Sequence, residues 1–218
     1  MKKGIIALIC MVITLVFIIV ALVGTWYSIS NKIEGAGYDY DMDVELSAGL
    51  ISSTGPDPET NEEVTKSNAD WRKQYEANGE DTGIFDVLDN TFYITIFTVI
   101  IAILAVIGIL GLTFNFGNPK TMKMIGGIFG IITLILAFVA VFYFMTTLPA
   151  EAELQTLENK DAGFWYSESK TEMGAKMSAS YGPGYAWYLM LIGAILALIA
   201  VILLFMDKQA APMSAPPQ

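Results

Sequence analysis

The sequence of 218 residues contains no histidine, a single cysteine (Cys10) and charged residues at only 16% of its positions. The lack of histidine and of a second cysteine excludes most zinc, copper and haem sites and any disulfide within the chain. A soluble domain carries roughly a quarter charged residues, so a single globular domain is not expected. The net charge of −10 offers no attraction for phosphates. We therefore expect no nucleic-acid partner, and nothing in the sequence indicates a cofactor.

Apolar residues are concentrated in four long runs that contain no Asp, Glu, Lys or Arg. These runs cover residues 4–24, 92–114, 124–148 and 186–206. A helix needs about 20 apolar residues to cross the ~30 Å hydrocarbon core of a bilayer, and it satisfies its own backbone groups as lipid demands. We therefore predict four transmembrane helices, with the lipid bilayer as their surroundings.

The first run shares features with a signal peptide, because Lys2 and Lys3 precede it and small residues follow its apolar part. Its apolar stretch is longer than the about 7–15 residues of a secretory signal. We favour a retained signal anchor. Cleavage, which would leave three spans, is the alternative.

Lysines near the span ends predict the orientation, because cytoplasmic segments carry an excess of Lys and Arg. On one side lie Lys2, Lys3, Lys120, Lys123 and Lys208. Both termini and the short connection 115–123 are therefore predicted to be cytoplasmic, in a protein of the cell membrane. The loops 25–91 and 149–185 then lie outside and hold most of the acidic residues. The proline-containing tail 207–218 is predicted to be disordered.

The first outer loop has the patterning of folded structure. Polar and apolar residues alternate through residues 38–46, which is typical of a strand with one buried and one solvated face. We predict further strands over residues 26–33 and 50–53, and a turn over the Gly- and Pro-containing residues 54–58. A short helix over residues 68–77 would be capped by Asn68 and stopped by Asn78 and Gly79.

The second outer loop is less regular. Residues 163–167 predict one strand, and residues 181–185 predict a tight turn into the last span. The predicted fold is mainly α: a left-handed four-helix transmembrane bundle carrying a small extracytoplasmic β-sheet domain, built from the two outer loops without disulfides.

This topology resembles the claudin and peripheral-myelin-protein superfamily of four-span membrane proteins. Trp26 stands at the start of the first outer loop, where that family has a tryptophan, and residues 49–51 (Gly-Leu-Ile) are similar to its Gly-Leu-Trp element. The sequence departs from the family pattern at Ile51 and in lacking the two cysteines of the loop. The resemblance implies the fold, with a sheet starting at Trp26, more than it implies sealing between cells.

The acidic side of the alternating strand is the one candidate cation site. Asp39, Asp41, Asp43 and Glu45 supply the oxygen ligands that Ca²⁺ prefers. Spacing by two along a strand makes a row rather than a cage, so a solvated face is the favoured interpretation.

Two further groups of residues are candidates for contacts. Aromatic anchors at an interface, or otherwise core of the outer domain, are Trp71, Tyr75, Phe164, Trp165 and Tyr166. Small residues that let helices approach closely, within the bundle or between two copies, are Gly126, Gly130, Gly193 and Ala197.

The favoured function is non-enzymatic. Without ionisable residues in the spans, a pump or proton-coupled transporter is not indicated. We expect the acidic outer domain to act in cell-surface contact, membrane organisation or support of a partner membrane protein, with another membrane or surface protein or a second copy as partner. The alternative is a cation channel, or an auxiliary subunit of a channel or transport complex, whose acidic mouth concentrates cations.

Overall fold

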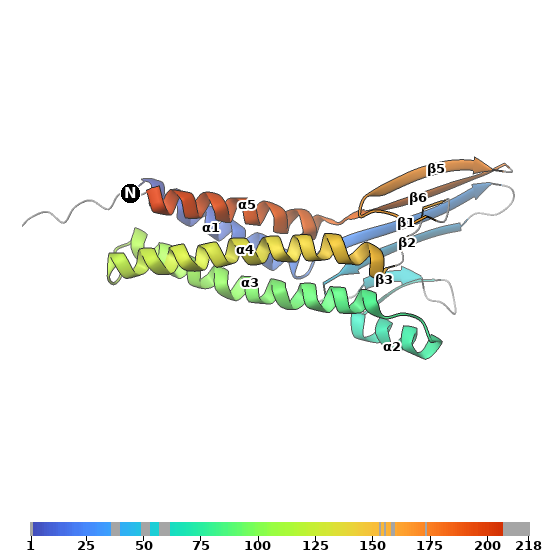
Figure 1. Cartoon of the computed structure of the whole chain (residues 1–218), viewed down its shortest axis with the longest axis horizontal. Helices are drawn as coiled ribbons and strands as arrows, with labels where there is room; N and C mark the ends of the chain where they lie inside the picture. Colours follow the sequence, from blue (N-terminus) through green and yellow to red (C-terminus); the bar gives the residue numbers. More distant parts are fainter. Residues whose placement is uncertain are drawn as a thin grey trace, which may run out of the picture.

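The computed structural model describes residues 2–35, 40–48, 53–56, 62–152, 154, 156–157, 160–172 and 174–206. Four long helices form a bundle, and six strands form one antiparallel sheet at one end of it (Figure 1). The strands run along the same long axis as the helices. The chain is therefore an elongated molecule with a helical end and a sheet end.

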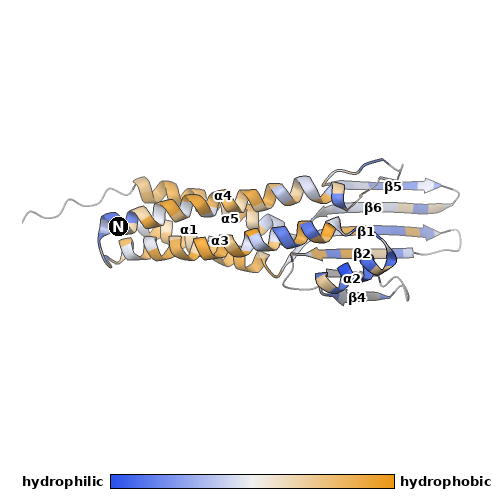
Figure 2. Ribbon diagram, turned by 60° about the horizontal axis from the view of Figure 1, so that its bottom comes forward, coloured by the Kyte–Doolittle hydropathy of each residue, from blue (hydrophilic) through white to orange (hydrophobic). Residues whose placement is uncertain are grey.

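The long helices are α1 (Lys2–Ala21), α3 (Gly83–Thr113), α4 (Pro119–Glu151) and α5 (Tyr185–Met206). All four are long and apolar enough to cross a membrane, which confirms the four predicted helical spans and indicates a multi-pass membrane protein. Hydropathy follows the same division, because apolar residues dominate the helices and polar residues dominate the sheet (Figure 2).

Two helices are longer than the apolar runs that predicted them. α3 begins at Gly83 rather than at Phe92, and its first turns combine the polar Asp86 and Asp89 with buried apolar residues such as Leu88. α4 begins at Pro119, where the side chain of Asn118 accepts hydrogen bonds from the first backbone amides, and it continues through Pro149 to Glu151. The predicted loop residues 83–91, 119–123 and 149–151 are thus helical, because hydropathy marks the apolar part of a helix and not its ends.

Small residues lie at many of the helix contacts inside the bundle, beside larger buried side chains such as Met11, Ile109 and Leu204. α1 packs beside α3 and α5, and α4 packs beside the same two helices, so the four helices close a ring. The buried alanines lie at these contacts: Ala7, Ala102, Ala105, Ala137, Ala140, Ala194, Ala197 and Ala200. Large apolar side chains such as Phe97, Ile100 and Ile135 lie on the outside instead. An apolar surface of this kind is consistent with a bundle that spans a membrane.

The strands are β1 (Thr25–Gly35), β2 (Tyr40–Ser47), β3 (Ser53–Pro56), β4 (Glu63–Lys66), β5 (Tyr166–Glu172) and β6 (Ala175–Pro183). Their order in the sheet is β4-β3-β2-β1-β6-β5. The first strand after α1 therefore pairs with the last strand before α5, and the two loops form one sheet, as predicted.

The strand predictions are correct where the alternation is strong. β1 confirms the strand over 26–33, and β2 confirms the alternating segment from Tyr40 onward. Of the predicted strand over 50–53, Ser53 opens β3 and the remainder lies outside the described residues, as do Tyr38 and Asp39.

Three other predictions for the loops are wrong in part. Thr54, Gly55 and Pro56 belong to β3 and pair with β4, although Gly and Pro indicated a turn. Asp57 and Pro58, the rest of that predicted turn, lie outside the described residues. Of the strand predicted over 163–167, residues 166 and 167 begin β5 and residues 163–165 precede it. Of the tight turn predicted over 181–185, residues 181–183 belong to β6, and Gly184 alone makes the connection to α5. These segments are strands because neighbouring strands supply hydrogen-bonding partners, which local sequence does not reveal.

Helix α2 (Asn68–Asn78) confirms the predicted short helix, with a different cap. The hydroxyl of Ser67 accepts a hydrogen bond from the backbone amide of Asp70, so Ser67 is the capping residue. Asn68 is buried and its side-chain amide donates to the carbonyl oxygen of Ser47 at 2.9 Å. Gly79 ends the helix in the left-handed conformation, with φ of 74°, as predicted.

Candidate interaction surface

Five aromatic side chains fill the contact between bundle and sheet, and this cluster is called the aromatic junction below. Its members are Trp26 and Tyr27 of β1, Phe144 of α4, Phe164 before β5, and Trp187 of α5. All are buried. Ring centroids lie 5.2 Å apart for Trp26 and Phe144, and 5.0 Å apart for Tyr27 and Phe164. Aromatic pairs at these separations stabilise a contact beyond the area they bury.

Each polar atom of the aromatic junction has a hydrogen-bond partner on the backbone of another segment. The indole nitrogen of Trp26 donates to the carbonyl oxygen of Ala21 at 2.7 Å, and that of Trp187 donates to Val141. The hydroxyl of Tyr27 donates to the carbonyl oxygen of Phe164 at 2.7 Å. Burial, and to a lesser degree the nearby Tyr181, raises the pKa of Tyr27 well above its ordinary value.

The connection from β6 to α5 is short and packs directly against β1. Gly184 alone joins the two elements, and its amide donates to the carbonyl oxygen of Trp26 at 2.9 Å. A Cβ at this position would lie 2.7 Å from the carbonyl carbon of Thr25, so any other residue would push β1 away. The sheet is therefore fixed to the bundle at the neighbouring strands β1 and β6 rather than tethered by a flexible linker.

The two faces of the sheet differ in chemistry, because residues that pair directly across strands share a face. The inner face packs against the hydrophobic core through Tyr27, Ile29, Val44, Leu46, Ala179 and Tyr181. The opposite side, called the outer face below, carries Ser28, Ser30, Lys32, Asp41, Asp43, Glu45, Ser167, Ser169, Ser178 and Ser180. The sheet therefore presents a polar and partly acidic surface.

Acidic residues of β2 form a ladder around one lysine on the outer face. The ammonium group of Lys32 lies 2.7 Å from the carboxylate of Asp41 and 4.0 Å from that of Asp43. The hydrogen bond to Asp41 raises the pKa of Lys32 above its ordinary value. Glu45 accepts a hydrogen bond from the hydroxyl of Thr25.

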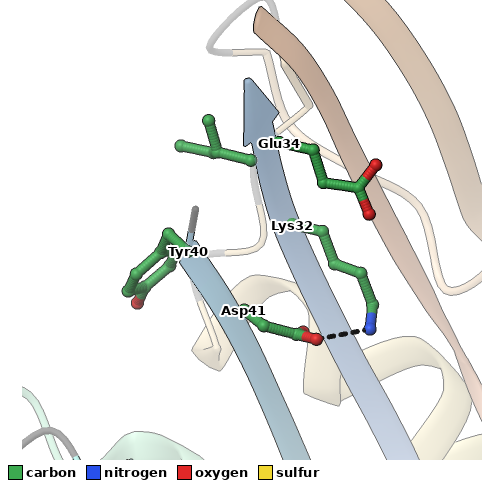
Figure 3. A pocket seen from close by; sticks show the side chains of 5 residues that line it. Lys32, Glu34, Tyr40 and Asp41 are labelled. Carbon is green, nitrogen blue, oxygen red and sulfur yellow. Dashed lines mark hydrogen bonds and ion pairs between the residues drawn. The ribbon is translucent and has the colours of Figure 1, made fainter. Parts of the chain in front are cut away.

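The candidate calcium ligands do not form a cage. Asp41, Asp43 and Glu45 follow one another along β2 as an exposed row, and Asp39 lies outside the described residues. Within the described part of the chain, no three His, Cys, Asp or Glu side chains come together as metal ligands. An open hollow of 410 Å³ lies at the ends of β1 and β2, where Lys32, Glu34 and Asp41 lie on one side and Tyr40 on the other (Figure 3).

The predicted aromatic anchors have different positions. Trp71 and Phe164 are buried in the core, and Tyr75 packs on Phe85 with ring centroids 5.3 Å apart. Tyr166 lies half-buried at the start of β5, stacked on the ring of Tyr181 and donating to Glu168. These four side chains are part of the domain's own packing. Trp165, whose surface is 54% exposed, is the only one of the five anchors that is broadly accessible.

The small residues predicted at helix contacts all lie inside the bundle. Gly126 packs against Gly108 and Ile109 of α3, and Gly130 packs against Val201 and Met11. Gly193 lies beside α1, where its carbonyl oxygen accepts a hydrogen bond from Thr14, and Ala197 is buried. These positions are occupied by contacts within one chain and are closed to a second copy.

No protein-family model and no curated protein matches this chain. The conclusion about function therefore depends on the fold and on the surface that the sheet presents.

Proposed function

We propose that this chain is a non-enzymatic multi-pass protein of the cell membrane that acts through its outer domain, defined as residues 25–91 and 149–185. The outer domain would serve cell-surface contact, membrane organisation or support of a partner membrane protein. The observation that carries this proposal is a sheet with a polar, exposed outer face, fixed to four membrane-length helices by the aromatic junction.

The distribution of charge supports an orientation with the sheet outside. Lys120 and Lys123 lie at the end of the bundle away from the sheet, where α1 begins and α5 ends (Figure 1). The sheet end holds most of the acidic residues of a chain with net charge −10. Because lysine-rich ends remain in the cytoplasm, both termini would be cytoplasmic.

The rigid attachment of the sheet supports a role in contact. A surface that is already ordered loses little conformational entropy on binding, which favours affinity. The exposed carboxylates of Asp41 and Asp43 would attract a partner with a basic surface and exclude an acidic one.

The packing of the bundle supports contact rather than conduction through one chain. The hydroxyls of Thr95 and Thr133 inside the bundle donate to backbone carbonyl groups, Thr95 to Thr91 at 2.7 Å and Thr133 to Phe129 at 2.8 Å. The hydroxyl of Thr91 is buried without a partner among the described residues. Alanines and glycines bring the helices into close contact around them. A polar channel would instead need such groups to face water.

The orientation is testable by labelling single cysteines in a Cys10→Ala background. Ser169→Cys, on the exposed sheet, is expected to react with a membrane-impermeant maleimide on intact cells. Thr121→Cys, at the opposite end of the bundle, is the matched control and is expected to react only after permeabilisation. The reverse pattern, or equal labelling of both, contradicts the proposed orientation.

The role of the outer face is testable by crosslinking intact cells and identifying captured membrane proteins. The double variant Asp41→Lys and Asp43→Lys is expected to lose the captured partner, whereas Lys73→Glu on α2 is expected to retain it. Cation flux through purified protein in liposomes that falls in the Asp41 and Asp43 variant would instead establish the channel alternative.

A further inference from the structure

Strand β5 lies at one edge of the sheet. Among the described strands it pairs only with β6, through residue pairs that run from Tyr166 opposite Tyr181 to Glu172 opposite Ala175. Ser167, Ser169 and Thr171 are exposed. An edge strand of seven residues offers a row of backbone donors and acceptors, which proteins either protect or use to add a strand from a partner.

The side chains of β5 are complementary to a second copy of the same strand. If two copies pair antiparallel with Ser169 opposite Ser169, residue 168 of each faces residue 170 of the other. Glu168 then lies opposite Lys170, and this pair occurs twice because the arrangement is two-fold symmetric. Opposite charges directly across an antiparallel pair are favourable, and like charges are unfavourable.

The charge around β5 is balanced, although the outer domain as a whole is acidic. The hairpin of β5 and β6 carries two glutamates, Glu168 and Glu172, and two lysines, Lys170 and Lys176. The carboxylates Asp41, Asp43 and Glu45 lie on β2, beyond β1 and β6 from this edge. A second copy that meets the domain at β5 therefore lies away from the acidic row of β2.

Both charged side chains, Glu168 and Lys170, have a partner close by along the strand. Lys170 lies 2.6 Å from the carboxylate of Glu172, and the hydroxyl of Tyr166 donates to Glu168, each two residues away along the strand. Lys170 and Glu172 are about half-exposed, so the ion pair between them contributes little to stability. Replacing the ion pair between Lys170 and Glu172 with a cross-strand ion pair therefore costs little free energy.

The direction of β5 determines where the second copy lies. The strand starts at the bundle and runs away from it along the long axis of the molecule (Figure 1). An antiparallel partner must run toward the first bundle, so its own bundle lies at the opposite end of the joined sheet. Two copies in one membrane have β5 strands that point the same way and cannot pair in this manner.

We propose that β5 is a homophilic docking edge, through which two copies in facing membranes join their sheets into one. This inference depends on the proposed function, since it requires the sheet to lie outside the membrane. The nine residues of β6 at about 3.3 Å each set the distance between the two membranes at about 30 Å. The exposed Trp165, directly before β5, lies next to the hairpin turn of the second copy.

Charge reversal on β5 tests this pairing in liposomes that carry the full chain. Two populations with donor and acceptor dyes are mixed, and docking is followed by energy transfer and by light scattering. The wild-type chain is expected to dock liposomes. Lys170→Glu alone and Glu168→Lys alone are each expected to weaken docking about tenfold or more, because each turns two attractive pairs into two repulsive ones.

Combinations of the same variants identify the register. The double variant Glu168→Lys and Lys170→Glu is expected to dock like wild type. Liposomes with Lys170→Glu are expected to dock to liposomes with Glu168→Lys, although neither docks to its own kind, since every cross-strand pair is then attractive. These recoveries also show that the single variants are folded. Lys176→Glu, on β6 and the other face of the hairpin, makes the same charge change and is expected to leave docking unchanged.

Several outcomes would overturn the proposal: no docking of wild-type liposomes, single variants that fail without recovery in the mixture, or association only within one membrane. Electron microscopy of the protein in detergent separates the last case, because the proposed dimer has its two micelles at opposite ends. The pairing of β5 can fail while the proposed function stands. In that case Ser169→Cys is labelled from outside and crosslinking of intact cells still captures a partner, but liposomes that carry the wild-type chain do not dock.

Discussion

The hydroxyl of Tyr27 donates a 2.7 Å hydrogen bond to the carbonyl oxygen of Phe164, a residue that lies in the other loop of the outer domain. Both residues are buried in the aromatic junction. This hydrogen bond therefore connects β1, at the start of the first loop, with the segment before β5, at the end of the bundle that carries the sheet. It fixes the position of β5, the proposed docking edge, relative to the membrane.

Replacing Tyr27 with phenylalanine tests that connection. The change keeps the ring and leaves the carbonyl group of Phe164 buried without its donor, which costs about 1–3 kcal/mol. We expect a lower midpoint of thermal unfolding in detergent, followed by tryptophan fluorescence. Tyr93→Phe, at an exposed hydroxyl on α3, is the matched control and is expected to change the midpoint little. Equal effects in the two variants would contradict the role assigned to Tyr27.

The raised pKa of Tyr27 predicts a loss of stability at alkaline pH. The unfolded chain releases the tyrosine proton near pH 10, whereas the folded chain retains it because burial penalises the phenolate. The unfolded state therefore binds fewer protons above pH 10, and the stability contribution that is present below pH 10 is lost as the pH rises. We expect the unfolding midpoint to fall more steeply above pH 10 for wild type than for Tyr27→Phe. Parallel pH curves would show that Tyr27 is not responsible.

Two glycines in the bundle are predicted to respond differently to alanine. A Cβ on Gly108 would lie 2.7 Å from the Cα atom of Gly126, so α3 and α4 would have to separate, at a cost of about 1–3 kcal/mol. The nearest atoms to a Cβ on Gly193 lie at 3.8 Å, which is ordinary contact. Gly193→Ala is expected to be neutral or stabilising by up to about 1 kcal/mol, because alanine favours the helix. Unfolding in detergent compares the pair, and the opposite ranking would contradict this packing.

Arg72 is predicted to hold α2 against α3. Its guanidinium group lies 2.9 Å from the carboxylate of Asp86 and 3.0 Å from that of Asp89, both on α3. Both contacts are made by the same guanidinium nitrogen, Nη2. Arg72→Lys keeps the charge but replaces the planar guanidinium group with an ammonium group on a different side chain. We expect faster amide hydrogen exchange in α2, with a stability change of about 0.2–1 kcal/mol because the pairs are partly exposed. Lys73→Ala, whose pair with Asp70 is mostly exposed, is expected to leave exchange unchanged.

Periodicity and hydropathy in the sequence were enough to predict the elements whose pattern depends on local sequence. Four charge-free runs predicted the four helices, because crossing lipid imposes length and apolarity on local sequence. The alternation from Tyr40 to Leu46 predicted β2 and its solvated side for a similar reason, since one face of that strand is buried. Gly79 predicted the end of α2 through its freedom to adopt positive φ.

The tertiary structure alone decided which residues meet. β3, β5 and β6 are poor in apolar residues. They are strands because β2, β6 and β1, respectively, supply their hydrogen-bonding partners. Burial separated Trp71 and Phe164, which belong to the core, from Trp165, which is exposed, although all three looked alike as aromatic residues in a polar loop. The alternate spacing of Glu168 and Lys170 indicates a partner strand only because β5 is an edge strand in the tertiary structure. A charge pattern can match a partner only where the backbone beside it is open to pairing.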